Sequence, residues 1–186
     1  MKTKFNLIFM LAIVSLTINS QTENKPIKPR ANHFSLGYSI NQFGKDFGLG
    51  LAATTPFIAN SIAFRVSENY MWCDYYDGSN TIWRGYHNVK LGVVTTAAII
   101  NNQIRVYAEG GVLMLITDKA FSSQSYSIGG YGVFGFEFLL RKMEDAHMSY
   151  FIEMGGMGTG AVAEKLATKP ILSNGFLMST GFKIYF

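Results

Sequence analysis

Residues 131–140 run Tyr-Gly-Val-Phe-Gly-Phe-Glu-Phe-Leu-Leu, and this stretch decides the fold class. Its three phenylalanines occupy alternate positions, and a glycine and a glutamate lie between them. Alternate side chains point to opposite faces of a β-strand, whereas the faces of a helix repeat every 3.6 residues. The stretch therefore predicts a strand with one strongly apolar face and one face of small or charged side chains.

The same alternation recurs along the rest of the chain, in segments separated by turn-forming or polar residues. A tilted strand needs about ten residues to cross a bilayer, and only its alternate residues meet lipid. The longer polar connections, 73–81, 117–126 and 159–174, are expected on the outer side of the membrane. We predict an all-β fold, an eight-stranded antiparallel transmembrane up-and-down β-barrel. Its predicted strands contain residues 34–40, 47–52, 62–67, 89–93, 104–114, 131–140, 150–155 and 175–186.

The composition agrees with a membrane barrel. Charged residues make up only 15% of the chain and aromatic residues 15%, whereas a soluble domain has about a quarter of its residues charged. The longest apolar run after residue 20 is 91–100, too short for the roughly twenty residues of a membrane helix. Residues 1–20 contain two lysines and no acidic residue, so without them the net charge falls from +4 to +2, which is too small to indicate nucleic-acid binding.

The chain divides into three parts. Residues 1–20 have the pattern of a signal peptide, with two lysines before an apolar core and a small residue at its end. Residues 21–32 are polar and contain two prolines, which predicts a flexible periplasmic leader. Residues 33–186 are predicted to form the outer-membrane β-barrel.

The inward parity of the predicted strands carries glycines and charges. Backbone groups in hydrocarbon need internal partners, so the strands must close into a barrel, and an eight-stranded lumen holds side chains but no wide channel. A buried charge is costly unless it is paired. We therefore expect these charges to occupy one layer and to form a salt-bridged plug in the lower lumen, with Lys90 higher up, alone or near tyrosines. An ion path or gate is the alternative. The charge cluster comprises Arg65, Arg105, Glu109, Glu137, Glu153 and Lys183.

Aromatic residues near the predicted strand ends suit the interfacial girdles of a membrane barrel. The candidates are Tyr70, Trp72, Trp83, Tyr86, Tyr150 and Tyr185.

The last eight residues, 179–186, resemble the terminal signal of outer-membrane β-barrel proteins. Ser179, Gly181, Ile184 and Phe186 occupy the polar, glycine, hydrophobic and terminal phenylalanine positions of that pattern. The resemblance implies that the barrel-assembly machinery recognises this segment.

The chain after the predicted signal peptide also resembles the small barrels of the OmpA membrane-domain and OmpX type. The stretches around Glu109 and Glu153 look like the Glu-Gly and Glu-x-Gly strands of such barrels. The resemblance implies a location in the outer membrane of a Gram-negative bacterium, in contact with outer-membrane lipid and lipopolysaccharide. It implies a fold and a place, and no activity.

No catalytic, metal-binding or cofactor-binding motif stands out. Cys73 is the single cysteine, so it forms no internal disulfide or thiolate cluster, and it is expected in a loop. Exposed loops on a rigid barrel are where binding evolves. The leading hypothesis is a structural or adhesion-like surface-recognition protein without a large pore, which meets its ligand through the extracellular loops.

Three alternatives stay open. A lipid A deacylase or acyltransferase would need a histidine near the outer leaflet, and His87 with Ser67 or the serines at 122, 123 and 125 is the candidate set. A barrel that transports small solutes or lipid has no residue signature. A soluble lipocalin-like barrel would expose the phenylalanines of residues 134–138 to water.

Overall fold

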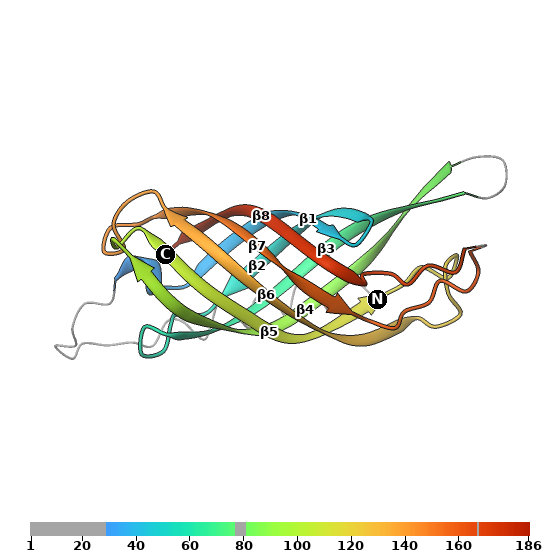
Figure 1. Ribbon diagram of the computed structural model, residues 1–186, viewed down its shortest axis with the longest axis horizontal. Helices are drawn as coiled ribbons and strands as arrows, with labels where there is room; N and C mark the ends of the chain where they lie inside the picture. The colour runs from blue at the N-terminus through green and yellow to red at the C-terminus, as the bar shows by residue number, and fades with distance from the viewer. Residues whose placement is uncertain (1–28, 77–80, 167) are drawn as a thin grey trace, which may run out of the picture.

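The computed structural model describes residues 29–76, 81–166 and 168–186 of the chain (Figure 1). The predicted signal peptide and residues 21–28 of the predicted leader lie outside the described residues. A short 3-10 helix η1 (Arg30–Asn32) precedes the strands. Within the described ranges, the strands are β1 (Ser35–Phe43), β2 (Asp46–Thr54), β3 (Ile62–Tyr76), β4 (Thr81–Ile100), β5 (Ile104–Ile116), β6 (Tyr126–Leu139), β7 (Met148–Gly158) and β8 (Gly175–Tyr185).

In the part of the chain that the structure describes, no helix is long and apolar enough to cross a membrane.

The eight strands form a closed antiparallel barrel in chain order. Each strand pairs with the next, and β1 pairs with β8 from Ser35 opposite Tyr185 to Phe43 opposite Leu177. Figure 1 shows the strands tilted relative to the long axis of the molecule. The predicted fold, an eight-stranded up-and-down β-barrel, is confirmed.

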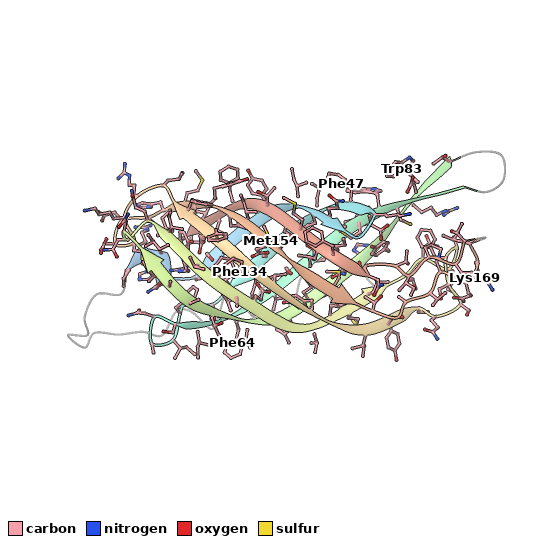
Figure 2. All side chains as sticks on the ribbon, in the orientation of Figure 1. Phe47, Phe64, Trp83, Phe134, Met154 and Lys169 are labelled. Carbon is pink, nitrogen blue, oxygen red and sulfur yellow. The ribbon has the colours of Figure 1, made fainter. Side chains whose placement is uncertain are left out.

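Side-chain burial follows the predicted parity. On β6, Phe134 and Phe138 are exposed on the outer face, while Glu137 between them is only 1% exposed. Figure 2 shows Phe47 and Phe64 projecting from the outer surface in the same way. Residues two apart share a face of a strand, so the alternation of the sequence becomes an apolar exterior and a polar interior.

Strands β3 and β4 are longer than predicted. The segment 73–81 is predicted as a loop, but β3 continues to Tyr76 and β4 begins at Thr81. Cys73 therefore lies in a strand and faces inward, buried among apolar side chains. The reason is the backbone ladder between the two strands, which runs on to Tyr76 opposite Thr81 and needs no apolar alternation.

The predicted leader is too long at its C-terminal end. Residues 30–32 form η1, in which Ala31 and Asn32 are buried. The guanidinium Nη2 of Arg105 donates to the carbonyl oxygen of Ala31 at 2.8 Å and to Oδ1 of Asn32 at 2.5 Å. These bonds anchor η1 against the lower end of the lumen.

Two of the predicted girdle aromatics point inward. Tyr86 donates its hydroxyl to Asp46, and the Tyr185 hydroxyl donates to Glu137; both rings are buried. Their strand parity is that of the lumen, which the girdle prediction overlooked. Tyr70 and Trp83 are exposed, as the prediction requires.

Candidate functional site

The structure places all the residues of the predicted charge cluster inside the barrel. They come from β3, β5, β6, β7 and β8, and each is at most 5% exposed. This set is Arg65, Arg105, Glu109, Glu137, Glu153 and Lys183.

The first ion-pair group centres on Arg65. Its Nη1 lies 2.6 Å from Oε2 of Glu109 and 2.5 Å from Oε1 of Glu153. The hydroxyl of Tyr131 donates to Oε1 of Glu109 at 2.6 Å, and the hydroxyl of Tyr107 donates to Oε1 of Glu153 at 2.6 Å. Each carboxylate thus has both a cation and a phenol as partners, and such full satisfaction is what a buried charge requires.

The second group centres on Glu137. Its Oε2 lies 3.0 Å from Nη1 of Arg105, and its Oε1 lies 3.2 Å from Nζ of Lys183. Ser149 donates to Oε1 at 2.7 Å, and Tyr185 donates to the same oxygen. One carboxylate therefore faces two cations, so this group carries an excess of positive charge.

Tyr107 joins the two groups. The guanidinium carbon of Arg65 lies 5.5 Å from the centre of the Tyr107 ring, and Nζ of Lys183 lies 4.7 Å from it. Cations over an aromatic face are attracted by its quadrupole. The charges, which were expected in one layer, form two groups linked through this ring. The sequence reasoning missed the role of Tyr107, although its inward parity was visible.

Lys90 lies apart from these groups. Its Nζ is 5.1 Å from the centre of the Tyr131 ring and 5.3 Å from that of Phe43. It is 5% exposed, and within the described residues it makes no ion pair. Cation–π contact with two rings gives this buried ammonium partial compensation only.

Apolar side chains fill the end of the lumen nearest the β5–β6 and β7–β8 connections, here called its outer half. Phe121 belongs to the β5–β6 connection, and Leu166 and Leu172 belong to the β7–β8 connection; all three are buried. They form one cluster with inward residues of the strands, among them Met71 and Leu115. The connections thus fold into the barrel mouth as well as projecting from it.

Glu164 ties the two outer connections together. It accepts hydrogen bonds from the Ser122 hydroxyl at 2.7 Å, and from the backbone N–H and the hydroxyl of Ser123 at 2.5 Å each. These bonds favour the ionised carboxylate and lower the pKa of Glu164 from 4.5 to about 2.

This contact leads to a pH prediction. Because folding lowers this pKa, the stabilisation that the ionised Glu164 carboxylate provides is fully present above pH 4.5. It is lost as the pH falls through about 2. We expect the Glu164→Ala variant to exchange the Ser123 amide hydrogen at least several-fold faster at pH 6, measured by NMR. Glu144→Ala, at the opposite end of the barrel, is the control and should leave this rate unchanged. Equal rates in wild type and Glu164→Ala would contradict the prediction.

The candidate enzyme residues are not brought together. Nδ1 of His87 lies 2.8 Å from Oε1 of Glu68 on the outer face. Ser67 is buried and faces the lumen, while Ser122 and Ser123 bind Glu164. An activated serine must lie within hydrogen-bond reach of its base, and in the described residues none of these serines does so at His87.

The predicted assembly signal forms most of β8. Ser179 and Gly181 face the lumen, whereas Ile184 and Phe186 are exposed. The backbone N–H of Phe186 donates to the carbonyl of Phe34 at 3.0 Å. Recognition of this segment by the assembly machinery stays a prediction. In the described ranges, no cluster of three or more His, Cys, Asp or Glu residues is placed to hold a metal ion.

Comparison with known proteins gives structural likenesses only. No protein-family model and no curated protein sequence matches the chain. Among solved structures, the chain is similar to the N-terminal β-barrel domain of Pseudomonas aeruginosa OprF, with 12% identity and a TM-score of 0.48 over 83% of this chain and 98% of that domain. It is also similar to the outer membrane protein OprG from Pseudomonas aeruginosa, with 14% identity and a TM-score of 0.49 over 84% of this chain and 98% of that protein.

Proposed function

We propose that the chain is an outer-membrane β-barrel protein without a large pore, which acts in surface recognition through its outer loops. The observation that carries this proposal is the combination of an apolar exterior with a filled lumen. The exterior suits lipid and the lumen leaves no wide path, so the parts beyond the barrel are the remaining candidates for function.

The exterior supports a membrane location. Soluble monomers rarely expose contiguous apolar patches larger than a few hundred square ångströms, and a closed barrel has no sheet edge to leave unsatisfied in hydrocarbon. Here every strand contributes large apolar side chains to the outer face. They include Leu36, Ile40, Leu49, Leu51, Phe64, Leu91, Val112, Ile128, Phe134, Phe138, Met154, Phe176 and Ile184.

The lumen supports the absence of a large pore. We expect the protein to give at most brief, small current events in planar lipid bilayers, because ion pairs fill the lower lumen and an apolar cluster fills the upper part. A porin with a water-filled lumen serves as the positive control under the same conditions. Stable, large current steps from the purified protein would contradict the proposed absence of a large pore.

The β3–β4 ribbon supports recognition at the surface. Pairing of β2 with β3 ends at Trp72, and pairing of β4 with β5 ends at His87, whereas β3 and β4 stay paired to Tyr76 and Thr81. Figure 1 shows the ribbon projecting beyond the barrel wall. Its outer edges offer backbone donors and acceptors, which an extended peptide can use by strand addition.

The two tryptophans provide a matched test of this role. Trp83 lies on the projecting ribbon and is 63% exposed, whereas Trp72 stacks on Phe47 and contacts Tyr70 on the barrel wall. The probes are host cells and surfaces coated with extracellular-matrix proteins, and the readout is binding of barrels reconstituted in lipid. We expect saturable binding that falls at least several-fold in Trp83→Ser and stays within twofold in Trp72→Ser. Absence of binding to every probe, or equal loss in both variants, would contradict the proposed role.

A further inference from the structure

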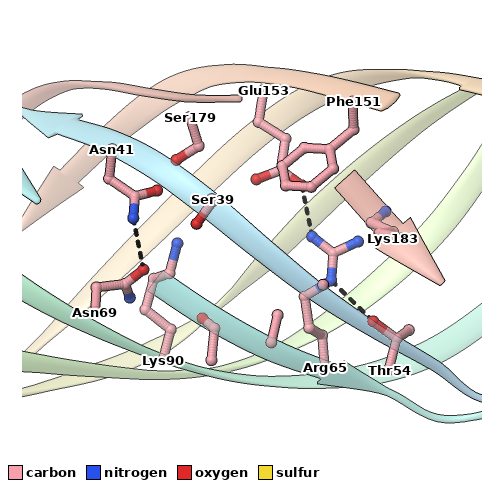
Figure 3. Close-up of a pocket in the computed structure, with 13 residues that line it drawn as sticks. Ser39, Asn41, Thr54, Arg65, Asn69, Lys90, Phe151, Glu153, Ser179 and Lys183 are labelled. Carbon is pink, nitrogen blue, oxygen red and sulfur yellow. Dashed lines mark hydrogen bonds and ion pairs between the residues drawn. The ribbon is translucent and has the colours of Figure 1, made fainter. Parts of the chain in front are cut away.

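A cavity of about 20 Å³ lies in the lumen and is bordered by residues of both ion-pair groups (Figure 3). Three of the side chains that line it are cationic: Arg65, Lys90 and Lys183. One is a carboxylate, Glu153, and that group is already bound to Arg65 and Tyr107. Arg65 and Lys183 are paired with acids of the two ion-pair groups, which leaves the charge of Lys90 to be compensated.

One of the buried charges of the lumen is unpaired. The buried charged residues of the described chain are four bases and three acids: Arg65, Lys90, Arg105, Lys183, Glu109, Glu137 and Glu153. Asp46, half-buried on the inward parity of β2 with its carboxylate bound by Tyr86, is a fourth acid of the lumen, so any uncompensated charge is local to one residue. Lys90 is the base without an ion pair in the described residues, and Figure 3 shows its side chain reaching into the cavity. Uncompensated charge of this kind is costly in a dry interior.

Hydroxyl groups complete the lining. Oγ of Ser179 is buried, lines the cavity and has no hydrogen-bond partner among the described residues. Ser39 lines the same cavity. A serine hydroxyl can donate one hydrogen bond, so these groups and the Lys90 ammonium supply donors to one small volume. Buried donors in native proteins are rarely left without an acceptor.

We propose that this cavity holds one monatomic anion of the size of chloride. An anion accepts from the Ser179 hydroxyl and the Lys90 ammonium, and its single negative charge compensates that unpaired ammonium. A cavity needs about 10–15 Å³ to hold one water-sized particle, so a halide fits and sulfate does not. A water molecule satisfies the donors as well, but it leaves the charge uncompensated.

Bromide is the direct probe, because it replaces chloride and scatters anomalously. Ion-pair residues line the cavity, and Phe43 and Tyr131 of the apolar cluster contact Lys90. The protein should therefore be refolded from denaturant in sodium bromide and then crystallised. We expect an anomalous peak beside Nζ of Lys90, and no such peak in protein refolded in sodium sulfate. Bromide found only on the surface, with water in the cavity, would overturn the proposal.

Thermal unfolding gives a second, independent measurement. A ligand that binds only the folded state raises the unfolding midpoint as its concentration rises. We expect the midpoint to rise with halide concentration, compared with sulfate at equal ionic strength, and Lys90→Met to abolish this dependence. Lys45→Met, which removes an exposed lysine, should retain it. The same halide dependence in both variants would refute the site.

Ser179→Ala keeps the test decisive if Lys90→Met does not fold. This variant removes one donor and no charge, so several-fold more halide should be needed for the same rise in the midpoint. An unchanged halide requirement, together with no bromide peak beside Lys90 in the wild type, would likewise refute the site.

Discussion

Replacing Arg65 with methionine should lower the free energy of unfolding by about 3–5 kcal/mol, the usual cost of breaking a buried ion pair by removing one partner. Arg65 bridges Glu109 and Glu153 at 2.6 and 2.5 Å, and all three side chains are buried. Methionine keeps much of the volume but leaves two carboxylates without their guanidinium. The measurement is urea unfolding of the barrel in lipid vesicles, followed by tryptophan fluorescence.

Two further variants separate charge from packing. The triple variant Arg65→Met, Glu109→Gln, Glu153→Gln removes the whole charge group, and we expect it to regain most of the lost stability, since replacing a complete buried ion group is often neutral. Lys45→Met, in the exposed β1–β2 turn, should change little. If the single variant unfolds at the same urea concentration as Lys45→Met, the ion pairs do not contribute as argued.

Replacing Gly181 with alanine should prevent most of the protein from folding. Gly181 of β8 lies opposite Ser39 of β1, in the pair of strands that closes the barrel. A Cβ atom there would overlap the carbonyl oxygen of Tyr38 and lie 2.8 Å from Cα of Ser39. Overpacking commonly costs about 1–3 kcal/mol, and here the obstacle is backbone of the closing strand, which cannot change rotamer.

Gly132→Ala is the matched control for this prediction. A Cβ atom at Gly132 meets no atom within 4 Å, so this variant should fold like the wild type. The folded fraction is measured by refolding into detergent micelles and comparing gel migration before and after boiling. Refolding without cellular factors separates the steric effect from the predicted role of Gly181 in assembly. Equal folded fractions in the two variants would contradict the argument.

The barrel and the composition of its lumen could be predicted because the alternation of residue types along each strand shows which side chains face outward and which face inward. On β6, alternation alone placed Phe134 outside and Glu137 inside, as the structure has them. The partners of each charge could not be predicted in this way. That Arg65 bridges two acids while Glu137 receives two bases depends on the stagger of the closed strands and on side-chain rotamers, which parity does not encode.

The ends of the strands were predicted less well, for a related reason. Beyond the part of the barrel that we propose to lie in the bilayer, the exterior no longer needs to be apolar, so the alternation fades where β3 and β4 continue as a ribbon. In β4, a register shift between Thr96 and Ala98 also interrupts the period of two. The burial of Ala31 and Asn32 depends on hydrogen bonds to Arg105, a residue distant in the sequence, and local composition gives no sign of it.

The unbroken ladder between β3 and β4 has a mechanical consequence. Since its rungs continue from Ile62 opposite Thr95 to Tyr76 opposite Thr81, the projecting arm cannot swing on a hinge independently of the wall. Under the proposed function, a ligand bound near Trp83 would stay at a fixed distance from the membrane, and a force on that ligand would be transmitted to the barrel strands.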